Sequence, residues 1–232
     1  MINSTSNNGD SKQVIVPNAL GEEYPEYRNS KPAEKIHKDA YKSLIGVMLS
    51  AQSQDKRTAQ ASRQLFALAD NPWDMVELDR DTVIEAIRPA GLFQAKSKNI
   101  LATSQMLIEE YEGKVPTTQK ELMRLPGVGK KSSDIVMRFV YGEPNIAVDT
   151  HVFRLLWRLG WTDSLDEGKT SYTVNETTPD EYKHAAHMQL ITHAKLVCKS
   201  RQPLCNECIL EEYCEKRDIG VPKYRLREVN KA

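Results

Sequence analysis

A lysine and an aspartate that begin successive helical segments are the residues of this chain best suited to carry out chemistry. Lys131 follows a glycine-containing turn, and Asp149 stands 18 positions later, before the next apolar helical stretch. The positive end of a helix dipole disfavours a protonated amine, so Lys131 could act as a neutral nucleophile. Asp149 is expected to cap its helix, and its carboxylate could also shuttle protons and stabilise developing positive charge. On spacing alone a solvated surface group is the commoner role of such a lysine, because most lysines in the first turn of a helix are exposed to water.

The turn before Lys131 has the composition of an anion-binding hairpin. It reads Leu-Pro-Gly-Val-Gly and joins two predicted short helices, with Lys130 directly after it. Glycines permit positive φ, so successive backbone N–H groups can converge on a phosphate at the start of the second helix. We therefore expect Pro126, Gly127, Val128, Gly129 and Lys130 to contact a nucleic-acid backbone. The alternative is an ordinary helix corner with a glycine C-cap.

All four cysteines lie close together near the C-terminus. Cys198, Cys205, Cys208 and Cys214 have intervals of six, two and five residues between them. Such a cluster is typical of a metal site rather than of disulfides. Four thiolates on a compact loop favour a [4Fe–4S] cluster, with zinc as the alternative. The cations Lys199 and Arg201 lie between the first two cysteines and could contact phosphates, although a solvated loop would look the same.

Composition limits the class of protein less than the motifs do. The chain has 232 residues, and 32 Lys and Arg balance 32 Asp and Glu, so any affinity for nucleic acid must come from local basic clusters. No apolar stretch is long enough for a membrane span, and the N-terminus does not resemble a secretory signal. We expect a cytoplasmic protein, associated with the nucleoid in a prokaryote, and no membrane partner.

The hydrophobic pattern predicts helices almost throughout. Residues 1 to about 30 are polar with little periodicity and are expected to be a mobile tail that gains order only where it docks. From Ala33 onward apolar residues recur at helical spacing, as in the series Val152, Leu155, Leu156 and Leu159. A last helix of about Pro179 to Val197 leads into the cysteines. No alternating strand pairs are found, so the fold class is all-α.

Four motifs in order resemble the endonuclease III family of helix-hairpin-helix DNA glycosylases. They are the stretches 49–52, 91–96 and 125–154 and the cysteine spacing, and together they cover roughly residues 33 to 217. The resemblance implies two helical domains flanking a DNA-binding cleft. One would be a six-helix barrel of residues 33–143 with the hairpin. The other would hold the iron–sulfur loop in residues 144–232, with the N-terminal segment 1–32 packed on it.

The resemblance also implies roles for individual residues. Lys131 would be the Schiff-base nucleophile and Asp149 the assisting carboxylate. Gln52 would fill the space left by an extruded nucleotide, and Leu92 would wedge into the opposite strand. Ser50 and His151 are candidates for the lining of the base pocket, the latter with a packing or capping role as the alternative.

The expected function is that of a DNA glycosylase and abasic-site lyase. The enzyme would act as a monomer on double-stranded DNA with a damaged base, chiefly an oxidised pyrimidine, or with an abasic site. One alternative is a uracil or thymine mismatch glycosylase of the same superfamily with weak lyase action. Another is a DNA-binding iron–sulfur module without enzymatic activity. An adenine-mismatch enzyme fits less well, because that branch typically lacks this lysine and carries a further C-terminal domain.

Overall fold

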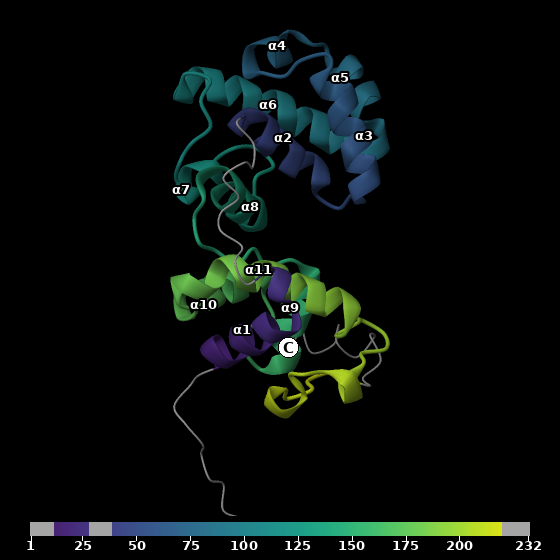
Figure 1. Ribbon diagram of the computed structural model, residues 1–232. Coiled ribbons are helices and arrows are strands. Elements are labelled where there is room, and N and C mark those ends of the chain that lie inside the picture. The colour runs from purple at the N-terminus through teal and green to yellow at the C-terminus, as the bar shows by residue number, and fades with distance from the viewer. Residues whose placement is uncertain (1–11, 28–38, 220–232) are drawn as a thin grey trace, which may run out of the picture. The chain divides into compact units, whose positions relative to one another are not determined.

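The computed structural model describes residues 12–27 and 39–219, and its backbone divides into two compact units. The central unit comprises residues 39–143, and the terminal unit combines residues 12–27 with residues 144–219. Every regular element in these ranges is a helix, which confirms the all-α prediction (Figure 1). Within the same ranges, no helix is long and apolar enough to cross a membrane.

The central unit is a helical bundle with its core around two helices. Its elements are α2 (Ala40–Ser50), α3 (Asp55–Phe66), α4 (Pro72–Glu77), α5 (Arg80–Ile87), the 3-10 helix η2 (Arg88–Ala90), α6 (Phe93–Tyr111), α7 (Gln119–Leu122) and α8 (Lys130–Tyr141). The described part of this unit thus has seven α-helices, one more than the resemblance implied, and α7 is a single turn.

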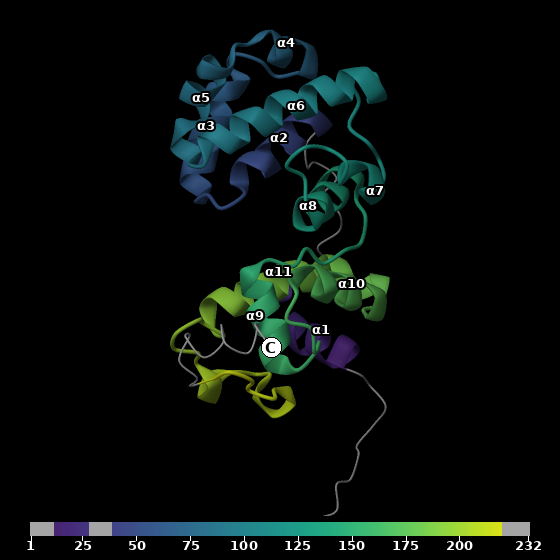
Figure 2. The same cartoon turned by 180° about the vertical axis from the view of Figure 1, so that it is seen from behind.

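Two helices organise the packing of the central unit. Helix α2 packs against α3, α6 and α8, and α6 also packs against α4 and α5, as Figures 1 and 2 show from opposite sides. Leu44, Ile45 and Leu49 of α2 are fully buried, together with Ile100 and Leu107 of α6. The apolar stripes predicted from helical spacing therefore face this core.

The terminal unit contains the elements on either side of the central unit in sequence. They are α1 (Lys12–Glu23), η1 (Pro25–Tyr27), α9 (Thr150–Leu159), α10 (Glu167–Thr177), α11 (Asp180–Leu196), η3 (Cys205–Glu207) and η4 (Glu211–Tyr213). Helix α11 packs against α1 and α9. The predicted stripe of α9 is buried in this core, beside Ala186, Leu190 and Ala194 of α11.

Residues 12–27 of the predicted N-terminal tail are ordered where they dock on the terminal unit. Helix α1 buries Val16 and Leu20 against the terminal unit. Lys12 donates from Nζ to the carbonyls of Leu159 (2.7 Å) and Gly160 (3.3 Å), at the negative end of α9. Pro17 and the small number of apolar residues mean that the local sequence does not predict this helix. Its stability comes from docking on the terminal unit. The rest of the predicted N-terminal segment, residues 1–11 and 28–32, lies outside the described ranges.

Candidate functional site

The predicted hairpin connects α7 to α8, and its geometry depends on one glycine. Gly127 has φ +80°, and a Cβ added there would lie 2.5 Å from Nδ2 of Asn99. Gly129 is extended, so the expected positive φ applies to Gly127 alone. The hairpin is fixed from inside, because Val128 is buried and the carbonyl of Pro126 accepts a hydrogen bond from Oγ1 of Thr103 (2.9 Å). Gly127 and Gly129 are exposed on this rigid base, whereas the backbone N–H of Val128 donates to the carbonyl of Leu125 (3.1 Å) and is not left for a phosphate.

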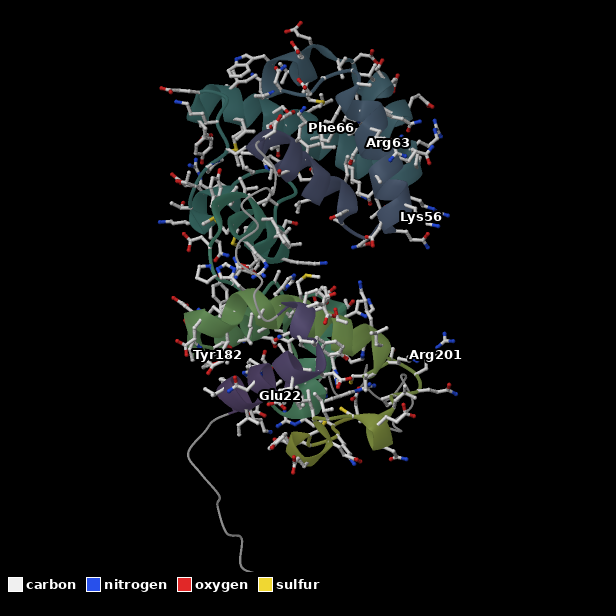
Figure 3. All side chains as sticks on the ribbon, viewed as in Figure 1. Glu22, Lys56, Arg63, Phe66, Tyr182 and Arg201 are labelled. Carbon is white, nitrogen blue, oxygen red and sulfur yellow. The ribbon has the colours of Figure 1, made fainter. Side chains whose placement is uncertain are left out.

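Three helices of the central unit begin without a side-chain cap, each beside a predicted DNA-binding turn. Their N-cap residues are Gln54 for α3, Leu92 for α6 and Gly129 for α8. Helices α2, α4, α5 and α7 are instead capped by Asp, Asn or Thr side chains. An uncapped helix start leaves its first N–H groups to water or a ligand, and its dipole favours an anion. The first turn of α3 contains Asp55 together with the exposed cations Lys56 and Arg57, and Lys56 extends outward in Figure 3.

The structure distinguishes the two adjacent lysines at the start of α8. Nζ of Lys130 lies 2.6 Å from Oδ1 of the buried Asp134 in an ion pair. Asp134 also accepts a hydrogen bond from Gln119, which ties α7 to α8. A phosphate contact by Lys130 would have to compete with this ion pair. Lys131 is exposed in the first turn of the helix, and no hydrogen bond or ion pair joins its side chain to the described residues.

Gln52 and Leu92 both stand in turns with left-handed backbone. Gln52 follows α2 with φ +52°, and Leu92 precedes α6 with φ +48°. Both side chains are exposed, and 56% of the surface of Leu92 is accessible to solvent. An exposed leucine on strained backbone is unfavourable by itself, which is typical of a residue that serves a ligand.

Ser50 lines a groove that borders the face of α8 carrying Lys131. The groove is formed by α2, α3 and α8, and Ile135 and Phe139 line it together with Phe66. Lys131, Ile135 and Phe139 are spaced at i, i+4 and i+8 and therefore share one face of α8. Ser50 itself donates from Oγ to the carbonyl of Val47 (2.7 Å). Its predicted place in a base pocket stays a prediction.

Asp149 caps α9, as its position before the apolar stripe predicted. Its Oδ1 accepts hydrogen bonds from the backbone N–H groups of His151 and Val152, both at 2.9 Å. No hydrogen bond from the described residues reaches Oδ2, which leaves one oxygen for chemistry. The amide of Asn175 holds the preceding segment by bonds to N and O of Ile146 (2.7 and 2.9 Å). Nδ1 of His151 is buried and has no hydrogen-bond partner among the described residues.

The four cysteines surround one hollow of the terminal unit. All four line it together with apolar side chains that include Leu155, Leu159, Leu204 and Leu210. Burial raises the pKa of the Cys208 thiol to about 11 and also raises that of Cys214, and the neighbouring cysteines contribute to both shifts. Four thiolates in such a place need a cationic group between them. Among the described residues, no three His, Cys, Asp or Glu side chains converge on one point as they would around a single metal ion.

Two arginines of α9, which sequence reasoning missed, hold the start of the cysteine loop. Arg154 donates to the carbonyls of Cys198 (3.1 Å) and Ala194 (2.7 Å). Arg158 is buried and donates to the carbonyls of Lys199 (2.8 Å) and Ser200 (3.2 Å), while its Nη1 lies 3.6 Å from Sγ of Cys198. Their i, i+4 spacing on a helix beside a cysteine cluster was the available signal.

The loop that these arginines hold presents the predicted phosphate contacts to solvent. Lys199 and Arg201 are both exposed, and Figure 3 shows Arg201 extending outward from the ribbon. Their backbone is anchored while their side chains are accessible. The arrangement suits a contact with a polyanion, although contact with DNA stays a prediction.

The sequence matches known proteins along most of its length. Residues 45–179 match the family described as HhH-GPD superfamily base excision DNA repair protein. Endonuclease III of Rickettsia felis is 36% identical over 203 residues, which cover 88% of this chain and 95% of that protein. Endonuclease III of Escherichia coli is 34% identical over 191 residues, covering 82% and 90%.

Solved structures give the same result at the level of the fold. A trapped endonuclease III–DNA covalent intermediate, described as an estranged-adenine complex, has a TM-score of 0.77 at 33% identity and covers 90% of this chain and 97% of that one. A non-covalent endonuclease III–DNA complex has a TM-score of 0.76 at 32% identity, covering 94% and 100%. A thermostable thymine-DNA glycosylase shares the fold, with a TM-score of 0.75 at 19% identity, covering 89% and 97%.

Proposed function

Because this chain belongs to the endonuclease III family of HhH-GPD base excision DNA repair proteins, we propose that it is a DNA glycosylase and abasic-site lyase. Its partner would be double-stranded DNA that contains damaged bases or abasic sites, and its preferred lesion would be an oxidised pyrimidine. We propose that it acts as a monomer, because one chain supplies both the nucleophile and the carboxylate. The observation that carries the proposal is the exposed Lys131, without a bond to the described residues, at the start of the hairpin helix.

The proposed reaction begins at Nζ of Lys131. The neutral amine attacks C1′ of the deoxyribose, the bond from C1′ to the base breaks, and the base leaves with the bonding pair. Asp149 would accept the proton that the amine loses, through the carboxylate oxygen that does not cap α9. The C1′–O4′ bond then breaks and O4′ takes up a proton, which opens the sugar ring and leaves a Schiff base between C1′ and Lys131. The Schiff base makes the C2′ proton acidic, so removal of that proton expels the 3′ phosphate by β-elimination. That a related structure is described as a trapped covalent intermediate with DNA supports a covalent route.

The proposed interaction with DNA combines contacts to backbone phosphates with the extrusion of one nucleotide from the duplex. The hairpin and the uncapped starts of α3, α6 and α8 would bind phosphates without reading sequence. Extrusion of a base costs a few kcal/mol, and damaged bases unstack more readily. Gln52 would replace lost pairing with amide hydrogen bonds, and Leu92 would supply an apolar wedge.

The proposed cofactor is a [4Fe–4S] cluster held by Cys198, Cys205, Cys208 and Cys214. Four thiols around one apolar hollow, of which Cys208 and Cys214 have a raised pKa, fit a cationic group that stabilises them as thiolates. When bound, the cluster would cross-link the loop and supply no step of base removal. Arg154 and Arg158 would hold the loop backbone in the same place.

Borohydride trapping of the Schiff base tests the proposed nucleophile. Lys131→Gln should give no covalent adduct with a duplex that contains an abasic site, while its affinity for a reduced abasic analogue is retained. Lys120→Gln, which removes an exposed lysine from α7, is the matched control and should form the adduct normally. An undiminished adduct in Lys131→Gln would refute the assignment.

Lesion preference requires a separate comparison. Duplexes with a single oxidised pyrimidine are compared with duplexes that carry uracil or thymine opposite guanine, and base release is measured under single-turnover conditions. We expect the oxidised pyrimidine to be released faster than uracil or thymine opposite guanine. Faster release of uracil or thymine would identify a mismatch glycosylase instead.

A further inference from the structure

A buried lysine of α6 connects the two turns that hold Gln52 and Leu92. Only 7% of the surface of Lys96 is accessible, and its Nζ donates to the carbonyl of Leu49 (2.7 Å) and to the carbonyl of Ala90 (3.0 Å). Both acceptors are backbone atoms, and no carboxylate of the described residues forms an ion pair with Lys96. A buried cation without an acidic partner is unfavourable, and burial lowers the pKa of Lys96.

The place of the acceptors explains what this lysine stabilises. Leu49 lies in the last turn of α2, three residues before Gln52, and the negative end of the helix dipole favours a cation there. Ala90 ends the 3-10 helix η2, two residues before Leu92. One ammonium group therefore joins the backbone immediately before each exposed side chain.

Both turns need an external restraint. Gln52 and Leu92 each adopt left-handed backbone without being glycine, which costs on the order of 1–3 kcal/mol per residue. Such a conformation persists only where the surroundings hold it. Arg80 supplies a second restraint at the start of α6, through a hydrogen bond to the carbonyl of Gln94 (3.1 Å), but its bonds do not reach the turn after α2.

We propose that Lys96 is a positioning residue that holds the turns of Gln52 and Leu92 in one fixed arrangement, so that both side chains enter a damaged duplex together. This inference rests on the proposed function. Lys96 does not touch the DNA or the reacting atoms. Its loss leaves two carbonyls without a partner and lets each turn relax separately, so extrusion slows while the chemistry at Lys131 is preserved.

The test compares a substrate that needs extrusion with one that does not. Lys96→Met keeps the length of the side chain and removes the donors. Lys98→Met removes the same charge from an exposed position on the same helix and is the matched control. Each variant is given an abasic site in a duplex and the same site in a single strand, where no opposite base requires a plug or a wedge. The rate of Schiff-base trapping is measured on both substrates. In the duplex, 2-aminopurine is placed opposite the abasic site, and its fluorescence rises when the 2-aminopurine base unstacks.

The expected result for Lys96→Met is selective. Its trapping rate on the duplex should fall roughly 10- to 100-fold, the range typical of a misplaced binding group. The 2-aminopurine signal should fall with it, while the rate on the single strand equals that of wild type. Lys98→Met should match wild type on both substrates. If Lys96→Met does not fold, Lys96→Gln, which keeps an amide donor, should show a smaller loss with the same selectivity.

Two results would overturn the positioning role. One is an unchanged duplex rate in a folded Lys96→Met or Lys96→Gln variant. The other is an equal loss on duplex and single strand, which would mean a general structural defect. Failure of the proposed function looks different, because wild type itself would then form no adduct with either substrate.

Discussion

Replacing Gly127 with alanine should destabilise the hairpin and weaken DNA binding together. The residue has φ +80°, where a side chain is strained whatever the available space. The added Cβ would also meet three atoms of Asn99, namely Nδ2 at 2.5 Å and Cβ and Cγ at 2.9 Å. Because Cβ of Asn99 is fixed to the backbone of α6, rotation of its side chain cannot relieve the whole clash.

The size of the effect follows from these two contributions. Left-handed backbone in an L-residue costs about 1–2 kcal/mol, and forcing a methyl group into packed atoms adds about 1–3 kcal/mol. We therefore expect the free energy of unfolding to fall by about 2–5 kcal/mol. Gly129 provides the comparison within the same turn, since it is extended and a Cβ there meets no atom within 4 Å. Gly129→Ala should leave the stability of the central unit close to that of wild type.

Urea denaturation followed by circular dichroism measures the loss, and fluorescence anisotropy measures affinity for a duplex with a reduced abasic site. In Gly127→Ala, Asn99→Ala should recover the part of the stability that the contact with Nδ2 removes, and the strain of positive φ should remain. The predicted role of Gly127 is refuted if Gly127→Ala unfolds at the same urea concentration as Gly129→Ala. It is also refuted if Gly127→Ala loses stability but binds DNA as wild type does, since the hairpin would then be no DNA contact.

Two further substitutions separate structural from chemical roles in the terminal unit. Asp149→Asn keeps a good helix cap, so stability should change by less than about 1 kcal/mol while base release falls roughly 100-fold or more. Single-turnover base release and thermal unfolding check this, and a fast Asp149→Asn enzyme would contradict it. Arg158→Met should destabilise the terminal unit by about 2–4 kcal/mol and reduce the iron bound per chain, because two partly buried carbonyls lose their donor and Asp218 loses its ion-pair partner. Iron analysis checks this, with the exposed Arg201→Met as control; equal iron in both would show that Arg158 is dispensable.

Features that depend on neighbours in sequence could be predicted from the sequence. The buried stripe of α9 and its cap Asp149 both follow from a spacing of a few residues. The order of the motifs also identified the family, because each is a continuous stretch. In the hairpin the prediction was only partly correct, since both glycines permit positive φ and only Gly127 uses it.

Features that depend on contacts between distant segments were decided by the tertiary structure. Composition predicted that residues 12–27 would gain order only where they dock, and α1 is a helix because α9 and α11 provide the surface that buries it. Two adjacent lysines look alike in sequence, and an ion pair within the folded hairpin occupies only Lys130. The role inferred for Lys96 needs Leu49, which lies 47 positions earlier, to come within 2.7 Å of its ammonium group. Local chemistry selects helices and caps, whereas the availability of a charged group depends on which distant atoms the fold brings to it.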